Sequence, residues 1–355
     1  MVKQDFEITV IDFYPQQQGF WRGELQKLGV NLLSYESQSK LDRIPRLVKD
    51  LVRKQPLIVH GWNFHMNPYA NFCGRIAGVP VRIGSVREHP SYWANSIFLK
   101  FSAVYGLNAL IFNSNTAYSF FKEKIQWPMK FLLPKGFVIN NGIEEQQDKN
   151  KDKLAKELLN VGISLPEDRK IVKIIGIGRL DANKNWSLLV KSCEHLSALG
   201  MNFIAVIFGE GPEKNNLLDQ IKHAKLQEKL ILAGSIPKTS RFLPLFDLLC
   251  SCSNSEGMPN TIMEASLAGL PVLATNAGGT NEVVDDYQTG ILVEQNNLRE
   301  FQEKLFYLAS NEEERIKMGL SGQEKIRNKF SSESMVRKTV EVYFDLLSKI
   351  DQGRG

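Results

Sequence analysis

The stretch that decides the fold of this 355-residue chain is residues 253–269, which read SNSEGMPNTIMEASLAG. It places the carboxylate of Glu256 in a loop that contains glycine and proline, and the carboxylate of Glu264 inside the helix that follows. Pro259 suits the first turn of a helix. The short polar side chain of Asn260 suits a cap that satisfies free backbone N–H groups. The stretch therefore predicts a loop that turns into a helix close to Pro259.

The start of this helix is a natural place for an anion. Gly269 is expected to end the helix, because glycine readily adopts the left-handed conformation found just after a helix. At the opposite end, the first backbone N–H groups have no partner within the helix, and the helix dipole favours negative charge there. We therefore expect an anionic ligand at this junction, with the rest of the chain as its scaffold.

Length and composition indicate a soluble protein of two units. A chain of 355 residues is too long for one ordinary core. Its 43% apolar and 23% charged residues are typical of globular proteins. No apolar run approaches the roughly 20 residues that cross a bilayer, and acidic residues interrupt the opening MVKQDFEITVID, so no secretory signal is expected. The cysteines lack a zinc-type pattern and are expected to be buried thiols in a reducing cytosol: Cys73, Cys193, Cys250 and Cys252.

The positive charge is concentrated in the first half of the chain. Residues 1–150 carry 18 basic and 12 acidic residues, whereas residues 151–355 carry 26 and 27. Residues 39–54 also form an amphipathic pattern with a basic outer face. Two interpretations stay open: an anionic membrane surface as a partner, or ordinary solvated lysines and a helix that covers a sheet. No nucleic-acid partner is expected.

Short apolar runs alternate with helical patterns along the whole chain, which predicts parallel βαβ units covered on both faces. The fold class is therefore α/β, with doubly wound domains expected at 1–150 and 151–330 and a terminal helix at 331–355. Strands are predicted at 6–13, 30–35, 57–60, 81–86, 109–113, 137–139, 173–177, 203–208, 230–233, 248–252, 272–275 and 290–293. Helices are predicted near 21–28, 39–54, 68–77, after 114, and at 185–199, 212–226, 240–246, 261–268, 298–309 and 331–347.

Four loops of the second unit follow strand ends and are expected at one edge of the sheet, where open α/β sheets bind ligands. They read GRLDANKN (178–185), GEGP (209–212), the opening stretch, and NAGGT (276–280). The first loop begins like a dinucleotide fingerprint, but Asp181 replaces its third glycine. Arg179 and Lys184 instead offer a planar fork and a point charge, which together suit a diphosphate. The loops predict a phosphate site.

These runs resemble the nucleotide-sugar-binding domain of the retaining family 4 glycosyltransferases. Glu256 and Glu264 match the Glu-x7-Glu pair of that family, and the turn NNGI at 140–143 resembles the turn at its inter-domain junction. The resemblance is strong over roughly 170–300 and loose over 1–140. It implies a twin-Rossmann fold of the GT-B type, with donor and acceptor bound between the domains. The chain starts at what resembles the second strand of that family, so the first βα unit of the N-terminal domain is expected to be missing.

The resemblance also implies a role for individual residues. Arg179 and Lys184 would hold the donor diphosphate, and Glu264 would bind the ribose hydroxyls. Glu256 would contact the transferred sugar and the distal phosphate. His60 matches a strand-end histidine on the acceptor side, with a hydrogen-bonded structural histidine as the alternative; His89 is a looser match of the same kind. The backbone around these side chains completes the implied donor site: Gly178, Gly209, Glu210, Gly211, Gly257, Met258, Pro259 and Asn260.

The resulting hypothesis is a cytoplasmic retaining glycosyltransferase, either free or peripheral on the inner face of the membrane. It would move a sugar from a nucleotide diphosphate-sugar to a glycan or lipid-linked acceptor, in cell-surface polysaccharide or glycolipid synthesis. No Asp-x-Asp motif occurs, so neither a metal nor a separate cofactor is expected. The alternatives are a twin-Rossmann sugar-nucleotide epimerase and a non-catalytic nucleotide-sugar-binding or scaffold homologue. The broken glycine fingerprint disfavours a dehydrogenase.

Overall fold

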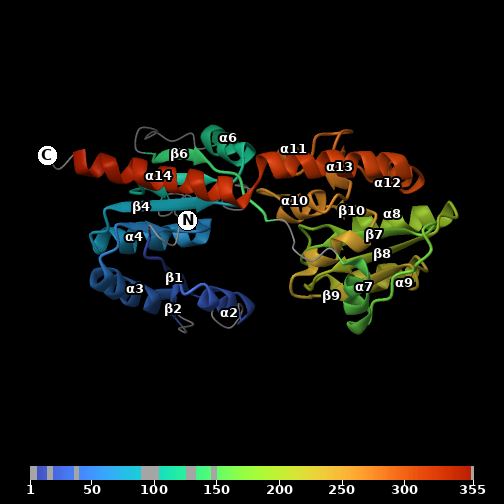
Figure 1. The fold of residues 1–355 in the computed structure, drawn as a ribbon, viewed down its shortest axis with the longest axis horizontal. Helices are drawn as coiled ribbons and strands as arrows, with labels where there is room; N and C mark the ends of the chain where they lie inside the picture. Colours follow the sequence, from blue (N-terminus) through green and yellow to red (C-terminus); the bar gives the residue numbers. More distant parts are fainter. Residues whose placement is uncertain are drawn as a thin grey trace.

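The structure is a computed structural model that describes residues 6–13, 19–35, 40–88, 104–124, 133–144 and 150–352. Two lobes lie side by side along the long axis of the molecule, each built on parallel strands (Figure 1). We call the part that contains strands β1 to β6 the first lobe, and the part that contains β7 to β12 the second lobe. Every strand pair among the described residues is parallel, as the sequence predicts. The division points at residues 150 and 330 stay a prediction.

The second lobe is a six-stranded sheet in the order β12-β11-β10-β7-β8-β9. Its strands are continuous apolar runs with both faces covered, and all six residues of β8 are buried. The strands are β7 (Val172–Ile177), β8 (Phe203–Phe208), β9 (Leu230–Gly234), β10 (Leu248–Ser251), β11 (Val272–Thr275) and β12 (Gly290–Val293). The helices are α7 (Lys151–Asn160), α8 (Trp186–Ala198), α9 (Lys214–His223), α10 (Asn260–Leu267), α11 (Thr280–Val283), α12 (Leu298–Ser310) and α13 (Glu312–Lys329), with a 3-10 helix η5 (Thr239–Leu245).

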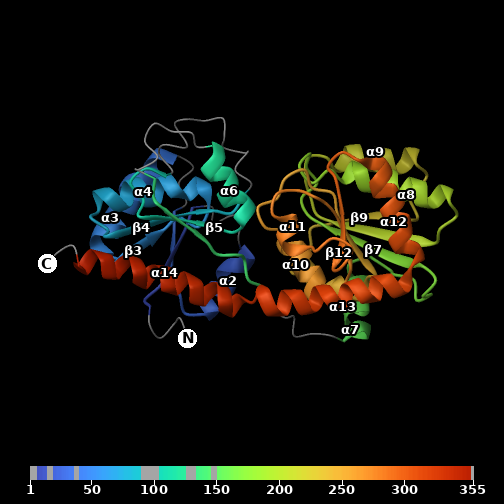
Figure 2. The same ribbon diagram turned by 90° about the horizontal axis from the view of Figure 1, so that it is seen from above.

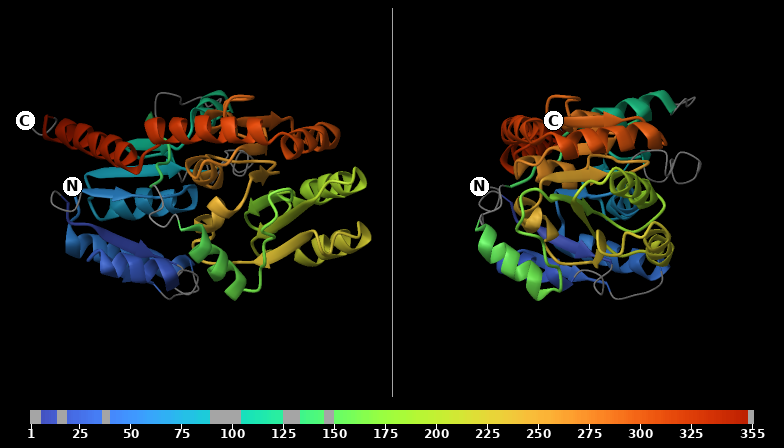
Figure 3. Two further views of the ribbon diagram at one scale, coloured as in Figure 1. Left: turned by 45° about the vertical axis from the view of Figure 1, so that its right-hand side comes forward. Right: turned by 90° about the vertical axis from the view of Figure 1, so that its right-hand side faces the viewer.

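The first lobe has its strands in two groups. One group is the pair β1-β2 and the other is the sheet β3-β4-β5-β6, and the pair lies apart from the larger sheet in Figure 1 and in the left view of Figure 3. The strands are β1 (Thr9–Asp12), β2 (Asn31–Ser34), β3 (Ile58–His60), β4 (Val81–Val86), β5 (Ala109–Phe112) and β6 (Lys135–Val138). The helices are α2 (Gly19–Lys27), α3 (Lys40–Lys54), α4 (Asn67–Ile76), α6 (Asn115–Lys124) and α14 (Ser332–Gln352), with a 3-10 helix η2 (Phe64–Met66).

A comparison of the two lobes shows what separates these groups. In the second lobe the first strand, β7, lies between β8 and β10, which gives the doubly wound order. In the first lobe β1 and β2 take the places of β8 and β9, and β3 to β5 take those of β10 to β12. Within the described residues no strand takes the place of β7. The edge strands β1 and β3 are half-exposed along their length, whereas β4 and β5 are largely buried.

The last two helices run along one side of the molecule, α13 against the second lobe and α14 against the first (Figure 2). Val342 and Leu346 of α14 pack against Val81 and Ile83 of β4. The chain crosses between the lobes twice at one place, where the amide of Ile143 donates to the carbonyl of Phe330 at 3.0 Å. The final helix therefore packs on the first lobe.

Helix α13 and the 3-10 helix η5 are among the segments that differ from the sequence-based expectation. Helix α13 was not predicted, because its two glycines weaken the helical pattern. Gly319 is needed there for close packing, since a Cβ atom would lie 2.0 Å from the carbonyl oxygen of Gly269. The predicted helix at 240–246 is instead the 3-10 helix η5, because Pro244 lies inside it and lacks the N–H of a regular helix.

Helix α3 distinguishes between the two interpretations of its amphipathic pattern. Its apolar residues Leu47 and Leu51 are buried in one cluster with Cys73 of α4 and Val79. This packing fits a helix that covers a sheet. Of the helices in the described ranges, none combines the length and the apolar character that spanning a membrane requires.

Candidate functional site

The loops at the carboxyl edge of the second sheet come together as the sequence predicts. The amide of Asn254 donates to the carbonyl of Asn183 at 2.7 Å, which joins the loops after β7 and β10. The amide of Gly279 donates to the carbonyl of Glu256 at 3.4 Å, which adds the loop after β11. The amide of Leu180 donates to the carbonyl of Glu210 at 3.0 Å, which adds the loop after β8. Four strand ends therefore build one surface.

Glycine is required where two of these loops touch. A Cβ atom on Gly209 would lie 1.8 Å from the carbonyl oxygen of Gly178, and one on Gly211 would lie 2.3 Å from that of Leu180. The backbones after β7 and β8 are thus in direct contact. The carboxylate of Glu210 receives a hydrogen bond from Lys214 at 2.9 Å on the exposed side of the loop.

Lys184 and Glu256 form an ion pair at the centre of this surface. The Nζ atom of Lys184 lies 2.5 Å from Oε1 of Glu256, and the two side chains are only 25% and 14% exposed. The sequence predicts both residues for the site but gives no sign that they pair. The backbone N–H of Lys184 donates to the carboxylate of Asp181 at 3.1 Å, which fixes the start of the lysine side chain. An incoming diphosphate would therefore compete with Glu256 for the ammonium group.

Arg179 is the mobile cation of the same edge. Its side chain is 77% exposed, and its Nε lies 3.5 Å from a carboxylate oxygen of Asp181. Its backbone is held in place because the indole N–H of Trp186 donates to the Arg179 carbonyl at 2.9 Å. The exposed ion pair with Asp181 contributes little to stability, so a ligand could displace it at little cost.

Helix α10 begins at Asn260 with its first amides uncapped by any side chain. The prediction that Asn260 caps this helix is wrong, because its Oδ1 accepts a hydrogen bond from Nδ2 of Asn141 at 2.8 Å instead. Pro259 occupies the cap position in an extended conformation. The predicted stop is confirmed, since Gly269 has a φ of 83° just after the helix. The helix start is thus open to an anion.

Glu264 of α10 is a largely buried carboxylate with no partner among the described residues. Among the described residues it has no ion pair, and no side-chain hydrogen bond reaches its carboxylate. Burial raises the pKa of Glu264 from 4.5 to about 7, since the charged form loses its hydration. A buried group with unused hydrogen-bonding capacity is a common property of ligand sites. Two adjacent hydroxyl groups would satisfy it.

Replacing Glu264 by glutamine is expected to stabilise the ligand-free protein at high pH. The pKa of the folded form lies above that of the unfolded chain, so the wild type loses stability as the pH rises from about 5 to 8. Glutamine carries no charge and removes this loss, which amounts to about 3 kcal/mol at pH 8. Thermal melts of both proteins at pH 5 and pH 8 check this. Equal differences in melting temperature at the two pH values would contradict it.

His60 lies in the first lobe, and both of its ring nitrogens are engaged. Nδ1 lies 2.8 Å from the hydroxyl of Tyr343 on α14, and Nε2 lies 2.7 Å from that of Ser85. Burial, and secondly the nearby charge of Arg87, lower the pKa of His60 to about 3. A direct role of His60 in catalysis would require one of these hydrogen bonds to break. The structure therefore favours a neutral, structural histidine whose hydrogen bonds connect α14 to β4. His89 lies outside the described residues.

The comparison with known families decides the identity of the second lobe. Residues 162–325 match the family described as Glycosyl transferases group 1. The second lobe is a group 1 glycosyltransferase domain. The match includes all four loops of the carboxyl edge, and with them Arg179, Lys184, Glu256 and Glu264.

Known relatives of this group 1 domain include several bacterial glycosyltransferases. A poly(ribitol-phosphate) alpha-N-acetylglucosaminyltransferase of Staphylococcus aureus is 27% identical over 50% of this chain and 36% of its own length. A Campylobacter jejuni 4-alpha-N-acetylgalactosaminyltransferase that acts on a diphospho-undecaprenol-linked sugar is 32% identical over 40% of this chain and 39% of its own length. A capsular polysaccharide biosynthesis glycosyltransferase of S. aureus is 22% identical over 89% and 83%. The chain spans well under half the length of the first two.

Solved structures extend the similarity to both lobes. A glycosyltransferase from Rickettsia africae superimposes with a TM-score of 0.75 at 21% identity, over 98% of this chain and 92% of that one. The Anabaena protein HepE in complex with UDP superimposes with a TM-score of 0.78 at 16% identity, over 96% and 100%. At these identities the likeness establishes the fold alone. The chain therefore has the predicted twin-Rossmann, GT-B-type architecture, in which the group 1 domain is the second lobe.

Further hydrogen bonds join the group 1 domain to the first lobe. Glu282 accepts hydrogen bonds from the amides of Asn115 and Thr116 at 2.9 and 2.8 Å, which places its carboxylate at the start of α6. Figure 2 shows α6 and α11 facing each other across the junction. Asn141 of the first lobe bonds Asn260 of α10. Such contacts join residues more than 100 positions apart, and no local pattern reveals them.

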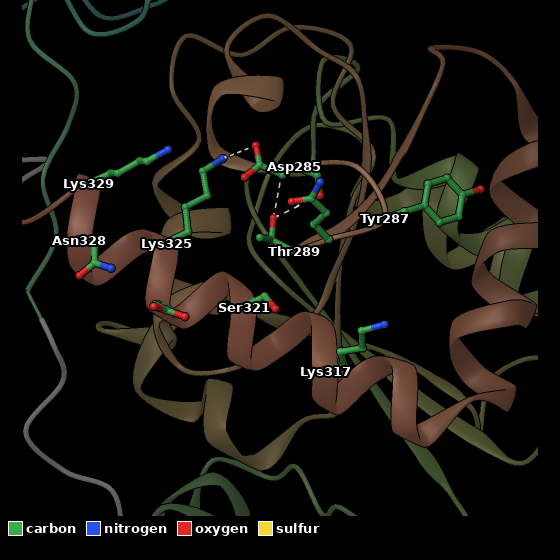
Figure 4. A pocket seen from close by; sticks show the side chains of 10 residues that line it. Asp285, Tyr287, Thr289, Lys317, Ser321, Lys325, Asn328 and Lys329 are labelled. Carbon is green, nitrogen blue, oxygen red and sulfur yellow. Dashed lines mark hydrogen bonds and ion pairs between the residues drawn. The ribbon is translucent and has the colours of Figure 1, made fainter.

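A second hollow lies at the opposite edge of the group 1 domain, before β12 (Figure 4). Lys317, Lys325 and Lys329 of α13 line it together with Asp285. Lys325 is already neutralised, since its Nζ lies 2.9 Å from a carboxylate oxygen of Asp285. The loops that the sequence predicts for a ligand lie at the other end of the strands. We therefore place the functional site at the carboxyl edge.

Proposed function

We propose that the chain is a retaining glycosyltransferase that takes a sugar from a nucleotide diphosphate-sugar and transfers it to a glycan or lipid-linked acceptor. The observation that carries this proposal is the convergence of Lys184, Glu256, Glu264 and the open start of α10 in a group 1 domain. The donor serves as a substrate, and we propose no further cofactor.

In this proposal the donor lies along the carboxyl edge of the second lobe. The diphosphate lies at Lys184 and at the amides of Gly257 to Asn260, within reach of the exposed Arg179. The ribose hydroxyls supply Glu264 with the partners that it lacks in the ligand-free protein. The base lies against the backbone contact between Gly178, Gly209 and Gly211. The transferred sugar then meets Glu256 at the face toward the first lobe.

The chemistry follows from where negative charge develops. The bond between the sugar C1 and the diphosphate oxygen breaks, and fixed cations and helix amides stabilise the charge on the leaving group. The acceptor oxygen bonds to C1 on the same face, and its proton passes to an oxygen of the leaving phosphate, so the configuration is retained. We propose that Lys184, Arg179 and α10 perform the role that a metal has in other transferases.

We propose a place in cell-surface polysaccharide or glycolipid synthesis, at the cytoplasmic face of the membrane. The relatives support this, since their names refer to capsular polysaccharide, to poly(ribitol-phosphate) and to a diphospho-undecaprenol-linked acceptor. The basic excess of residues 1–150 supports attraction to an anionic surface.

One observation favours a second candidate, a nucleotide-sugar-binding homologue without catalysis. Among the described residues of the first lobe, no strand joins the pair β1-β2 to the sheet β3-β4-β5-β6, whereas the second lobe has a single continuous sheet. Such a homologue would bind the nucleotide but would neither transfer nor hydrolyse the sugar. A sugar-nucleotide epimerase would convert its substrate with no acceptor present.

A thermal-shift panel of nucleoside diphosphates and their sugars tests the proposal. One base is expected to raise the melting temperature in a saturable way as diphosphate and as diphosphate-sugar, because a ligand bound only by the native state adds about 2.7 kcal/mol at 100 times its Kd. The matching nucleoside is expected to have almost no effect. If no diphosphate stabilises the protein at millimolar concentration, the proposed function is wrong.

A further inference from the structure

Arg87 lies at the seam between the lobes, beside the loop that carries Glu256. It follows β4, at the carboxyl edge of the first sheet. A Cβ atom on Gly257 of the second lobe would lie 2.2 Å from the Arg87 carbonyl oxygen, so the two backbones are in contact. The guanidinium carbon lies 4.1 Å from the ring centroid of Trp62, and Nη1 donates to Oδ1 of Asn141 at 3.0 Å. Arg87 is therefore a fixed cation close to the place where an acceptor would meet the donor sugar.

Within the part of the chain that the structure describes, the guanidinium of Arg87 forms no ion pair with a carboxylate. Its Nε is buried and has no hydrogen-bond partner. The neighbouring imidazole of His60 is neutral and supplies no negative charge. A cation held largely out of water without a counter-ion is costly, which favours binding of an anion.

Asn113 contacts the backbone of Arg87 and also carries a buried atom without a partner. Its side chain is 2% exposed, and its Nδ2 donates to the carbonyl of Arg87 at 3.0 Å. Its Oδ1 is buried and has no partner. Buried polar atoms are almost always satisfied in native proteins, so two such atoms on residues that both meet Gly257 are unusual. They favour a ligand that offers an anionic oxygen to Arg87 and a hydroxyl group to Asn113.

The surroundings fit a sugar. The ring of Trp62 is 52% exposed, although the guanidinium of Arg87 stacks on it, so apolar surface remains for a pyranose ring. In the second lobe, the hydroxyl groups of Ser253 and Ser255, just before Glu256, are also buried without partners.

We propose that Arg87 recognises an acidic group, a carboxylate or a phosphate, on the acceptor, and that Asn113 accepts a hydrogen bond from a neighbouring hydroxyl. The acceptor is thus an acidic glycan unit. This inference rests on the proposed function, since it names the substrate class of the same site. A purely structural Arg87 would only join Trp62 to Asn141 and would not discriminate between acidic and neutral sugars.

Titration of the Trp62 indole N–H signal by NMR tests this proposal without any nucleotide sugar. The signal is assigned by its loss in Trp62→Phe. Glucuronate and glucose 1-phosphate are each expected to shift it in a saturable way, and the tighter of the two identifies carboxylate or phosphate as the preferred group. Neutral glucose is expected to bind at least tenfold more weakly than the tighter acid.

Arg87→Met is expected to weaken the acidic sugar at least tenfold, whereas Arg87→Lys keeps part of the binding. Arg299→Met serves as the matched control, because it removes an exposed cation of α12 that pairs with Glu303 and should leave this titration unchanged. The proposal is overturned if glucose binds as well as the acids, or if a folded Arg87→Met responds like the wild type. If Arg87→Met does not fold, the wild-type titrations with the acidic sugars and with glucose still test the proposal. Since no donor is present, a negative result here leaves the thermal-shift test of the donor site unaffected.

Discussion

Replacing Lys184 by methionine is expected to slow sugar transfer by a factor of about 10² to 10³, the usual cost of removing one group that stabilises the charge of a transition state. Lys184 is the buried cation of the carboxyl edge, and in the ligand-free protein it is held 2.5 Å from Glu256. The diphosphate gains charge as its bond to the sugar breaks, so the ammonium group binds the transition state more tightly than the donor. The effect should therefore lie in kcat more than in KM.

The variant has a side effect that needs its own control. Methionine leaves the carboxylate of Glu256 without its counter-ion, and that side chain is only 14% exposed. The double variant Lys184→Met/Glu256→Gln is expected to recover stability but not transfer. Rates come from release of the nucleoside diphosphate, and stability comes from thermal melts. A transfer rate within threefold of the wild type in a folded Lys184→Met protein would rule out this role.

Replacing Glu264 by alanine is expected to weaken binding of the nucleoside diphosphate by a factor of about 10 to 150. The loss corresponds to about 1.5 to 3 kcal/mol for hydrogen bonds to a charged group. Both hydroxyls of the ribose are expected to donate to this carboxylate, which has no other partner among the described residues. Glutamine has a similar shape but only one acceptor oxygen, so Glu264→Gln should fall between alanine and the wild type.

Calorimetric titration with the diphosphate found in the thermal-shift panel measures these affinities. Glu303→Ala is the matched control, because it removes an exposed carboxylate of α12 that pairs with Arg299 on the surface. Its affinity should equal that of the wild type. The 2′-deoxy form of the nucleotide should lose less on mutation of Glu264 than the ribose form does. If mutation of Glu264 weakened binding of the 2′-deoxy nucleotide and of the ribose nucleotide by the same factor, Glu264 would not bind the ribose 2′-hydroxyl.

The carboxyl edge of the second lobe was predictable because its chemistry is local in sequence. Each loop directly follows an apolar strand, and parallel strands bring such loops to one edge. The pairing of Lys184 with Glu256 was not predictable, because 72 residues separate them and each side chain could have paired with other charged residues. The pattern also revealed the position of Glu264 but not its lack of a partner, which depends on the packing around α10.

The first lobe shows where local patterns fail. His60 ends a strand in the sequence-based prediction and in the structure. Its two hydrogen-bond partners, however, are Ser85 and Tyr343, which is 283 residues away. Arg87 looked like any basic residue after a strand, and only the contact with Gly257 places it at the seam. These features are decided by the way in which distant segments pack.

A crystal structure of the protein with UDP tests the central claim most directly, or with the diphosphate of another base if the thermal-shift panel selects one. We predict that the diphosphate lies against Lys184 and the start of α10, with the ribose at Glu264. The nucleotide would instead contradict our account if it occupied the hollow lined by Lys317 and Lys329 at the opposite edge of the second lobe, and left the Lys184–Glu256 pair intact.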